Sequence, residues 1–148
     1  MTYKSAYVVD THVLIWYLQN SKLLSANAQA IFRASERGET RIHVSAISVA
    51  EMYYANQKYR WFSNFSTILN ELKQMPYIRI VEFAADDVLD FEKNALVLEM
   101  HDRIIVGLAR RLDASLITVD SQIIAANLTP IVWWKIQTIQ KCNTHFQR

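Results

Sequence analysis

YVVDTHVLIWYL, residues 7–18, changes its hydrophobic pattern at Asp10. The three residues before Asp10 form a short, largely β-branched apolar run, which is typical of a buried strand. After Asp10, the apolar residues Val13, Leu14, Tyr17 and Leu18 recur at helical spacing. The stretch therefore predicts a strand over residues 7–9 and a helix over residues 11–17, with an acidic residue at their junction.

Short strands and helices continue to alternate along the chain. Further strands are predicted at residues 41–44, 77–81, 115–119 and 131–134. Capping and stop signals, such as Ser25 and Gly38, predict helices at residues 25–36, 47–57, 63–74, 85–98, 102–112 and 120–126. Strands joined through helices need crossover connections, so we expect a three-layer α/β/α sandwich with a short, mostly parallel central sheet.

Two of the predicted helices have an apolar face at helical spacing, which indicates the side that turns inward. For the helix at residues 85–98, the expected inward residues are Val88, Phe91, Ala95 and Leu98. For the helix at residues 102–112, they are Ile105, Leu108, Ala109 and Leu112.

The composition excludes several classes of site. With only two glycines, the chain has no phosphate-binding loop or dinucleotide fingerprint, and with one cysteine it has no internal disulfide or thiolate zinc site. A net charge of +2 means that any nucleic-acid surface must be a local patch. The 148 residues fit one domain, with a core at about 7–134 and a tail at 135–148 to which we assign no function.

The sequence also bears on location. Its first residues lack the basic start, apolar stretch and cleavage site of a signal peptide. The longest uncharged run covers 14 residues, 121–134, contains a proline and is too short to span a bilayer. We therefore expect a cytoplasmic protein that does not enter the membrane.

Four carboxylates stand where strands end or helices begin. They are Asp10, Glu51, Asp102 and Asp120. Each has a structural explanation, because the aspartates can be N-caps and Ser48 with Glu51 matches a capping box. In a parallel sheet, however, strand ends and helix starts meet at one edge, where a ligand site is expected. Four converging carboxylates repel one another unless a hard divalent cation binds them, so they also predict a Mg²⁺ or Mn²⁺ site with nuclease chemistry.

The segments around these acids resemble the successive signatures of PIN-domain ribonucleases, most of all the VapC-type toxins of toxin–antitoxin pairs. The similarity covers about residues 7–134, in the family's order and spacing. It rests on VVDTHVLIW (8–16), SAISVAE (45–51), HDRIIV (101–106) and LITVD (116–120).

This resemblance implies an endoribonuclease that uses one or two Mg²⁺ or Mn²⁺ ions. The acids that match the family's quartet, and would be both catalytic and metal-binding, are Asp10, Glu51, Asp102 and Asp120. Thr11 and Thr118 match hydroxyl positions beside the quartet that orient ligands or water. The partners that it implies are an RNA substrate, a cognate antitoxin and a second copy of the chain in a homodimer.

One loop departs from the family pattern. Many relatives have an Asp-Pro shortly before the third acid, where this chain has Glu99-Met100-His101. Glu99 either supplies a peripheral carboxylate or belongs to a loop that simply differs. Arg103 and Arg110 are candidate RNA contacts, although such arginines are commonly solvated helix residues.

An aromatic cluster spans the two middle helices, at Tyr53, Tyr54, Tyr59, Trp61, Phe62 and Phe65. Core packing is expected for part of it, in particular for Tyr54. The resemblance implies a groove for an antitoxin helix here, and helix-in-groove partners use such aromatic anchors.

Two alternatives to a toxin remain open. One is a non-catalytic PIN-like module that binds RNA or protein, with the acids as caps. The other is a stand-alone RNA-processing nuclease with the same site. A haloacid-type phosphatase would need a second aspartate two residues after Asp10, where this chain has His12.

Overall fold

A sheet of five parallel strands forms the centre of the protein, and the computed structural model describes residues 5–132. The strands lie in the order β3-β2-β1-β4-β5. Their bounds are β1 (Ala6–Val9), β2 (Arg41–Ser45), β3 (Ile78–Val81), β4 (Ser115–Ile117) and β5 (Ile131–Val132). The five predicted strands are confirmed within the described residues; the last two residues of the predicted strand 131–134 lie outside them.

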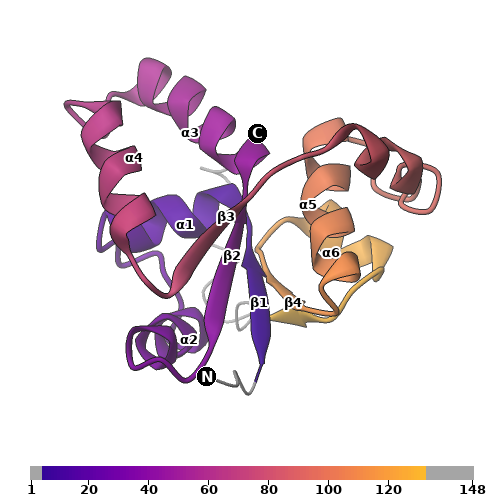
Figure 1. Cartoon of the computed structure of the whole chain (residues 1–148), viewed down its shortest axis with the longest axis horizontal. Helices are drawn as coiled ribbons and strands as arrows, with labels where there is room; N and C mark the ends of the chain where they lie inside the picture. Colours follow the sequence, from indigo (N-terminus) through magenta and orange to yellow (C-terminus); the bar gives the residue numbers. More distant parts are fainter. Residues whose placement is uncertain (1–4, 133–148) are drawn as a thin grey trace.

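Helices cover both faces of the sheet, as predicted for a three-layer α/β/α sandwich (Figure 1). One face carries α1 (Thr11–Leu18), α2 (Ala26–Glu36), α3 (Ala46–Tyr59) and α4 (Phe65–Gln74). The other carries α5 (Met100–Arg111) and α6 (Ser121–Ala126), with the 3₁₀ helix η1 (Ala85–Asp90) beside α5. Two apolar cores, one on each face, hold these layers to the sheet.

The connections that follow β1 and β4 lead toward opposite edges of the sheet. From β1 the chain proceeds outward to β2 and β3, and it then returns to build β4 and β5 on the other side of β1. The carboxyl ends of two adjacent strands with divergent connections form the crevice in which such sheets bind ligands. The residues that follow Val9 and Ile117, the last residues of these strands, lie at this crevice.

Most helix ends follow the predicted signals. Ser25 caps α2 through its side chain, and Gly38 follows the helix with a φ of 79°, which a residue with a Cβ rarely adopts. Asp10 and Asp120 cap α1 and α6, as expected. The predicted capping box of Ser48 and Glu51 is wrong, because α3 begins at Ala46 and is capped by Ser45.

The predicted helix at residues 85–98 is also wrong. Only residues 85–90 are helical, as η1, and turns occupy most of the segment that follows. The inward face assigned to it does not exist, since Val88 and Ala95 are exposed and Leu98 is 77% exposed. Asn94 and Val97 are buried instead, so two side chains of this segment pack into the fold and a helical face does not.

Two further predictions on packing need correction. In α5, Ile105, Leu108 and Ala109 are buried as expected, but Leu112 follows the helix and is exposed. Tyr54 was expected in the core and is 72% exposed on α3. No helix among residues 5–132 has both the length and the apolar character needed to cross a bilayer.

Candidate active site

Asp10 lies at the crevice between β1 and β4 and is only 2% exposed. Its carboxylate accepts a hydrogen bond from the Thr11 backbone N–H at 2.8 Å, through Oδ1, which caps α1. Its Oδ2 accepts a hydrogen bond at 2.7 Å from Oγ1 of Thr118, the residue that follows β4. The functional and the capping interpretations of Asp10 are therefore compatible, because one oxygen caps the helix while the other is bound to the neighbouring strand end.

Thr11 connects Asp10 to the second acid. Its Oγ1 is 2.7 Å from Glu51 Oε1 and 3.0 Å from Ser48 Oγ, and both partners lie on α3. A threonine hydroxyl has one proton, so the charged carboxylate of Glu51 is the stronger acceptor for it. The side chain of Glu51 thus points at the start of α1 and not at its own helix end.

Asp102 stands in the first turn of α5, where it is 3% exposed. It was expected to open this helix, but α5 begins at Met100 and its N-cap is Glu99, whose Oε2 accepts a hydrogen bond from the Asp102 N–H at 2.9 Å. A carboxylate in the first turn still benefits from the helix dipole. The preceding residue, His101, places Nδ1 3.3 Å from Glu99 Oε1 and 3.7 Å from Glu51 Oε2. The starts of α1, α3 and α5 are therefore joined by side-chain contacts.

Asp120 has a clear structural role as the N-cap of α6. Its Oδ1 accepts hydrogen bonds from Gln122 N–H at 2.9 Å and Ile123 N–H at 3.0 Å, which cap α6. Its own backbone N–H donates to Thr118 Oγ1 at 3.0 Å. Thr118 therefore connects Asp10 to the backbone of Asp120, which fixes the relative positions of the two acids after β1 and β4.

The chemistry of this donor set suits a hard divalent cation. The acids supply oxygen donors only, and two of them, Asp10 and Asp102, are buried carboxylates, which are costly to keep charged without a compensating cation. Within residues 5–132, no three His, Cys, Asp or Glu side chains are grouped closely enough to form a complete ligand set. Mg²⁺ does not require such a set, because it commonly takes one or two protein carboxylates and completes its octahedron with water and phosphate.

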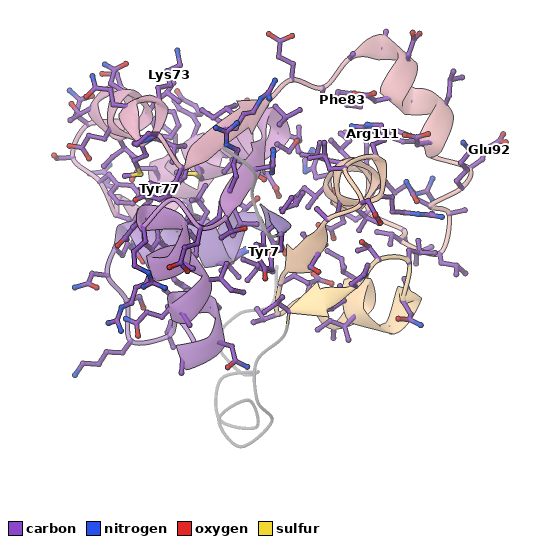
Figure 2. The ribbon with its side chains drawn as sticks, turned by 60° about the horizontal axis from the view of Figure 1, so that its bottom comes forward. Tyr7, Lys73, Tyr77, Phe83, Glu92 and Arg111 are labelled. Carbon is purple, nitrogen blue, oxygen red and sulfur yellow. The ribbon has the colours of Figure 1, made fainter. Side chains whose placement is uncertain are left out.

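The two arginines predicted to contact substrate both donate hydrogen bonds to a loop. Arg103 donates to the backbone carbonyls of Val97 and Ala95, and Arg110 donates to the carbonyl of Lys93 and to Asn94 Oδ1. The neighbouring Arg111 reaches from α5 toward η1, as Figure 2 shows. Arg103 and Arg110 therefore attach the segment that connects η1 to α5, and Arg111 attaches η1 itself.

The aromatic cluster forms an exposed surface on α3. Tyr53, Tyr54 and Tyr59 are exposed, whereas Trp61 and Phe65 are partly buried against the first core. Tyr59 stacks on Trp61 with 4.8 Å between ring centroids, and Tyr53 meets Phe65 edge-on at 5.5 Å. These ring contacts hold the exposed tyrosines in place on the surface.

A family model for the PIN domain matches residues 7–127, which is most of the chain and includes all four acids. The chain belongs to the PIN domain family. A comparison with curated protein sequences finds no match.

Several solved structures contain a chain with the same fold. In VapBC2 from Rickettsia felis, bound to a DNA fragment from their promoter, the similar chain has 16% identity and a TM-score of 0.63, over 88% of this PIN domain chain and 99% of its own length. The similar chain of FitAcB from Neisseria gonorrhoeae has 17% identity and a TM-score of 0.62, over 84% of this chain and 95% of its own length. The similar chain of DNA-bound VapBC from Salmonella typhimurium has 13% identity and a TM-score of 0.63, over 88% of this chain and 99% of its own length. At these identities the likeness shows a shared fold.

Some contacts of this PIN domain were missed at the sequence level. The Glu99-x-x-Asp102 spacing could have indicated that Glu99 caps α5, because a carboxylate three residues before a backbone N–H is a capping geometry. The contact of Thr11 with Glu51 had no such signal. It joins residues 40 positions apart, and only the packing of α1 against α3 brings them together.

Proposed function

We propose that this PIN domain is a Mg²⁺- or Mn²⁺-dependent endoribonuclease and the toxin of a toxin–antitoxin pair. The observation that carries the proposal is the contact network at the β1–β4 crevice. Asp10 is bound by Thr118 on one side and is adjacent to Thr11 on the other, and Thr11 binds Glu51. A buried carboxylate held in a fixed position at a topological switch point, with a second acid joined to it through Thr11, is what a preorganised metal site requires.

Each residue has a distinct part in this proposal. Asp10 and Asp102 would hold the metal, with Asp120 at the edge of the site; when bound, the metal polarises the phosphodiester and activates a water. Glu51 either joins these ligands or accepts the proton of the attacking water, and Thr11 orients its carboxylate. Thr118 fixes Asp10 through Oδ2, as outer-shell groups commonly do for carboxylate ligands.

The toxin role is supported by the family and by the kind of complex in which its fold recurs. The similar structures are named VapBC, FitAcB and a toxin–antitoxin complex from Klebsiella pneumoniae. For this chain we propose that an antitoxin segment binds over the exposed tyrosines of α3, since exposed aromatic side chains held by neighbours are typical anchors. Tyr54→Ala should abolish a complex with the cognate antitoxin and leave the melting temperature unchanged; an undiminished complex would refute this site. A homodimer in the cytoplasm remains part of the same proposal.

The activity is tested by RNA cleavage. Purified wild-type protein and Asp10→Asn are incubated with total RNA and Mn²⁺, and 5′ ends of new fragments are counted. The wild type should cut at defined sites, and Asp10→Asn should be slower on the order of a hundredfold or more, because a metal ligand matters at least as much as its outer-shell partners. Asp86→Asn, which removes an equal charge at an exposed position, is the matched control and should cut like the wild type. Equal cleavage by a folded Asp10→Asn protein would refute the proposal.

A second candidate function is that of a non-catalytic binding module. The observation that favours it is that residues 5–132 hold no group of three His, Cys, Asp or Glu side chains that could bind a metal ion. A non-catalytic module would use the same acids as helix caps, which Asp10 and Asp120 are. Such a module would leave RNA intact at every metal concentration, and Asp10→Asn would alter only its stability.

A further inference from the structure

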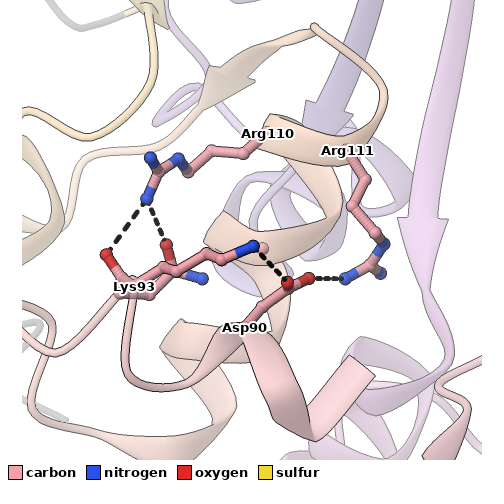
Figure 3. A pocket seen from close by; sticks show the side chains of 6 residues that line it. Asp90, Lys93, Arg110 and Arg111 are labelled. Atoms are coloured by element: carbon pink, nitrogen blue, oxygen red, sulfur yellow. Dashed lines mark hydrogen bonds and ion pairs between the residues drawn. The ribbon is translucent and has the colours of Figure 1, made fainter. Parts of the chain in front are cut away.

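A second site lies on the outer side of α5, away from the four acids. Here a pocket of about 210 Å³ opens between α5 and the segment that follows η1 (Figure 3). Its lining residues are Asp90, Lys93, Asn94, Gly107, Arg110 and Arg111. Arg110 is eight residues beyond Asp102 on the same helix, which at a rise of 1.5 Å per residue places its Cα about 12 Å further along the axis.

Gly107 forms the floor of this pocket. Glycine in the middle of a helix costs about 1 kcal/mol relative to alanine, so its presence in α5 calls for an explanation. A Cβ at this position would lie 3.2 Å from Asn94 Nδ2 and 3.5 Å from Arg111 Nη1. The missing side chain thus lets the amide of Asn94 approach the helix backbone closely inside the pocket.

Asn94 presents a hydrogen-bond donor to the same space. It is 1% exposed, and its Oδ1 accepts a hydrogen bond of 2.6 Å from Arg110 Nη1, which fixes the orientation of the amide. Nδ2 is therefore the atom that faces Gly107, and among residues 5–132 no group accepts a hydrogen bond from it. Because Asn94 lines the pocket, its Nδ2 is available to donate a hydrogen bond to a ligand there.

The charges around the pocket leave an excess of positive groups. Asp90, the single carboxylate in the lining, already faces two cations, with Oδ2 2.9 Å from Arg111 Nη1 and Oδ1 3.8 Å from Lys93 Nζ. Asp87 lies behind it, with Oδ2 3.5 Å from Arg111 Nη2. The three cationic side chains, Lys93, Arg110 and Arg111, thus outnumber the two carboxylates. The polar groups of the lining that make no contact given above are N–H donors.

We propose that this pocket binds a phosphate group. Guanidinium groups present paired donors that match the oxygens of a phosphate, Lys93 adds a positive charge, and Asn94 Nδ2 supplies a neutral donor from the floor. The phosphate belongs either to an RNA backbone or to a small molecule such as a mononucleotide, because both offer the same chemistry. The proposal rests on the pocket alone and does not depend on the nuclease activity.

The sharpest variant is Asn94→Asp. It keeps the oxygen that Arg110 binds, so the segment stays attached, and it replaces the Nδ2 donor with an oxygen of negative charge. Inorganic phosphate is titrated into ¹⁵N-labelled protein without metal, and the Gly107 amide signal is followed. The chain has only two glycines, so the Gly38 signal is the internal reference.

The wild type should show a saturable shift at Gly107 and none at Gly38. Asn94→Asp should weaken phosphate binding by about tenfold or more, since it removes a hydrogen bond to a charged group and adds repulsion. Asn70→Asp, on the exposed side of α4, adds the same charge elsewhere and should bind like the wild type. Lys93→Gln, whose side chain is largely exposed, should bind several-fold more weakly without any effect on folding.

Two further titrations identify the source of the phosphate. They use adenosine monophosphate and a short oligoribonucleotide without terminal phosphates, with EDTA present to prevent metal-dependent cleavage. Binding of the oligoribonucleotide that Asn94→Asp weakens assigns the pocket to the RNA backbone, and binding of adenosine monophosphate and phosphate alone assigns it to a small molecule. Absence of saturable binding for all three probes, or equal binding by folded Asn94→Asp and Lys93→Gln proteins, would overturn the proposal.

Discussion

At the residue scale, Thr118 is the group on which the geometry of the candidate site depends. Its hydroxyl donates to the buried Asp10 carboxylate at 2.7 Å and accepts from the Asp120 backbone N–H at 3.0 Å. The strand ends predicted that Asp10 and Asp120 lie at one edge of the sheet, and the family resemblance placed Thr11 and Thr118 beside the acids. The sequence could not indicate which oxygen binds which hydroxyl, since these contacts depend on the register of β1 and β4.

Replacement of Thr118 by valine tests this role at nearly constant volume. Thr118→Val leaves Asp10 Oδ2 without its hydroxyl donor, and the loss of a hydrogen bond to a buried carboxylate should lower the free energy of unfolding by about 1–3 kcal/mol. The measurement is urea unfolding at pH 7. Thr118→Ser keeps the hydroxyl and should lose much less stability, and equal losses for the two variants would show that the hydroxyl is unimportant.

At the element scale, the connection between η1 and α5 shows where a helical pattern misleads. Val88, Phe91, Ala95 and Leu98 repeat at helical spacing, yet three of them are exposed. The segment is held instead by guanidinium groups from α5 that bind its carbonyls, and a long-range contact of this kind leaves no local period in the sequence. The start of α5 was misplaced for a similar reason, because Glu99 caps the helix from outside the apolar pattern.

Removal of one of these guanidinium groups should loosen this segment specifically. Arg103→Gln leaves the carbonyls of Val97 and Ala95 without their donor, so amide hydrogen exchange over residues 93–98 should become faster by about tenfold, equivalent to about 1.4 kcal/mol of opening free energy. Hydrogen exchange with mass spectrometry measures this directly. Arg33→Gln, at an exposed position on α2, is the control. Unchanged exchange in Arg103→Gln would mean that Arg103 does not hold the segment and that Arg110 and the burial of Asn94 and Val97 do.

At the scale of the whole molecule, the order of the elements followed from the sequence, and the order of the strands did not. Alternating strands and helices predicted a parallel sheet, whereas the placement of β1 at its centre depends on which edge each crossover joins. This placement buries β2 as well, and with it His43. Burial lowers the pKa of the His43 imidazole below 6.5, and the guanidinium groups of Arg41 and Arg79 lower it further, against the effect of the Tyr7 carbonyl.

The stability of the whole domain should therefore depend on pH. Because the pKa of His43 is lower in the folded state than in the unfolded state, the unfolded chain binds more protons as the pH falls through 6.5. The free energy of unfolding should thus decrease below that pH and level off once the folded imidazole is also protonated. His43→Gln should remove this part of the dependence between pH 7 and pH 5 in urea unfolding, while His101→Gln should retain it. An identical pH profile for His43→Gln and the wild type would contradict the assignment.

The central claim is that the acids at the β1–β4 crevice form one metal site, and a Mn²⁺ titration followed by calorimetry tests it most directly. No RNA target has to be known for it. Wild type and Asp86→Asn should bind Mn²⁺ saturably, and Asp10→Asn and Asp102→Asn should each bind more weakly by about tenfold or more, because each removes one of the buried carboxylates proposed as ligands. Binding that neither substitution changes, or no binding by the wild type even with a short oligoribonucleotide present, would contradict the claim.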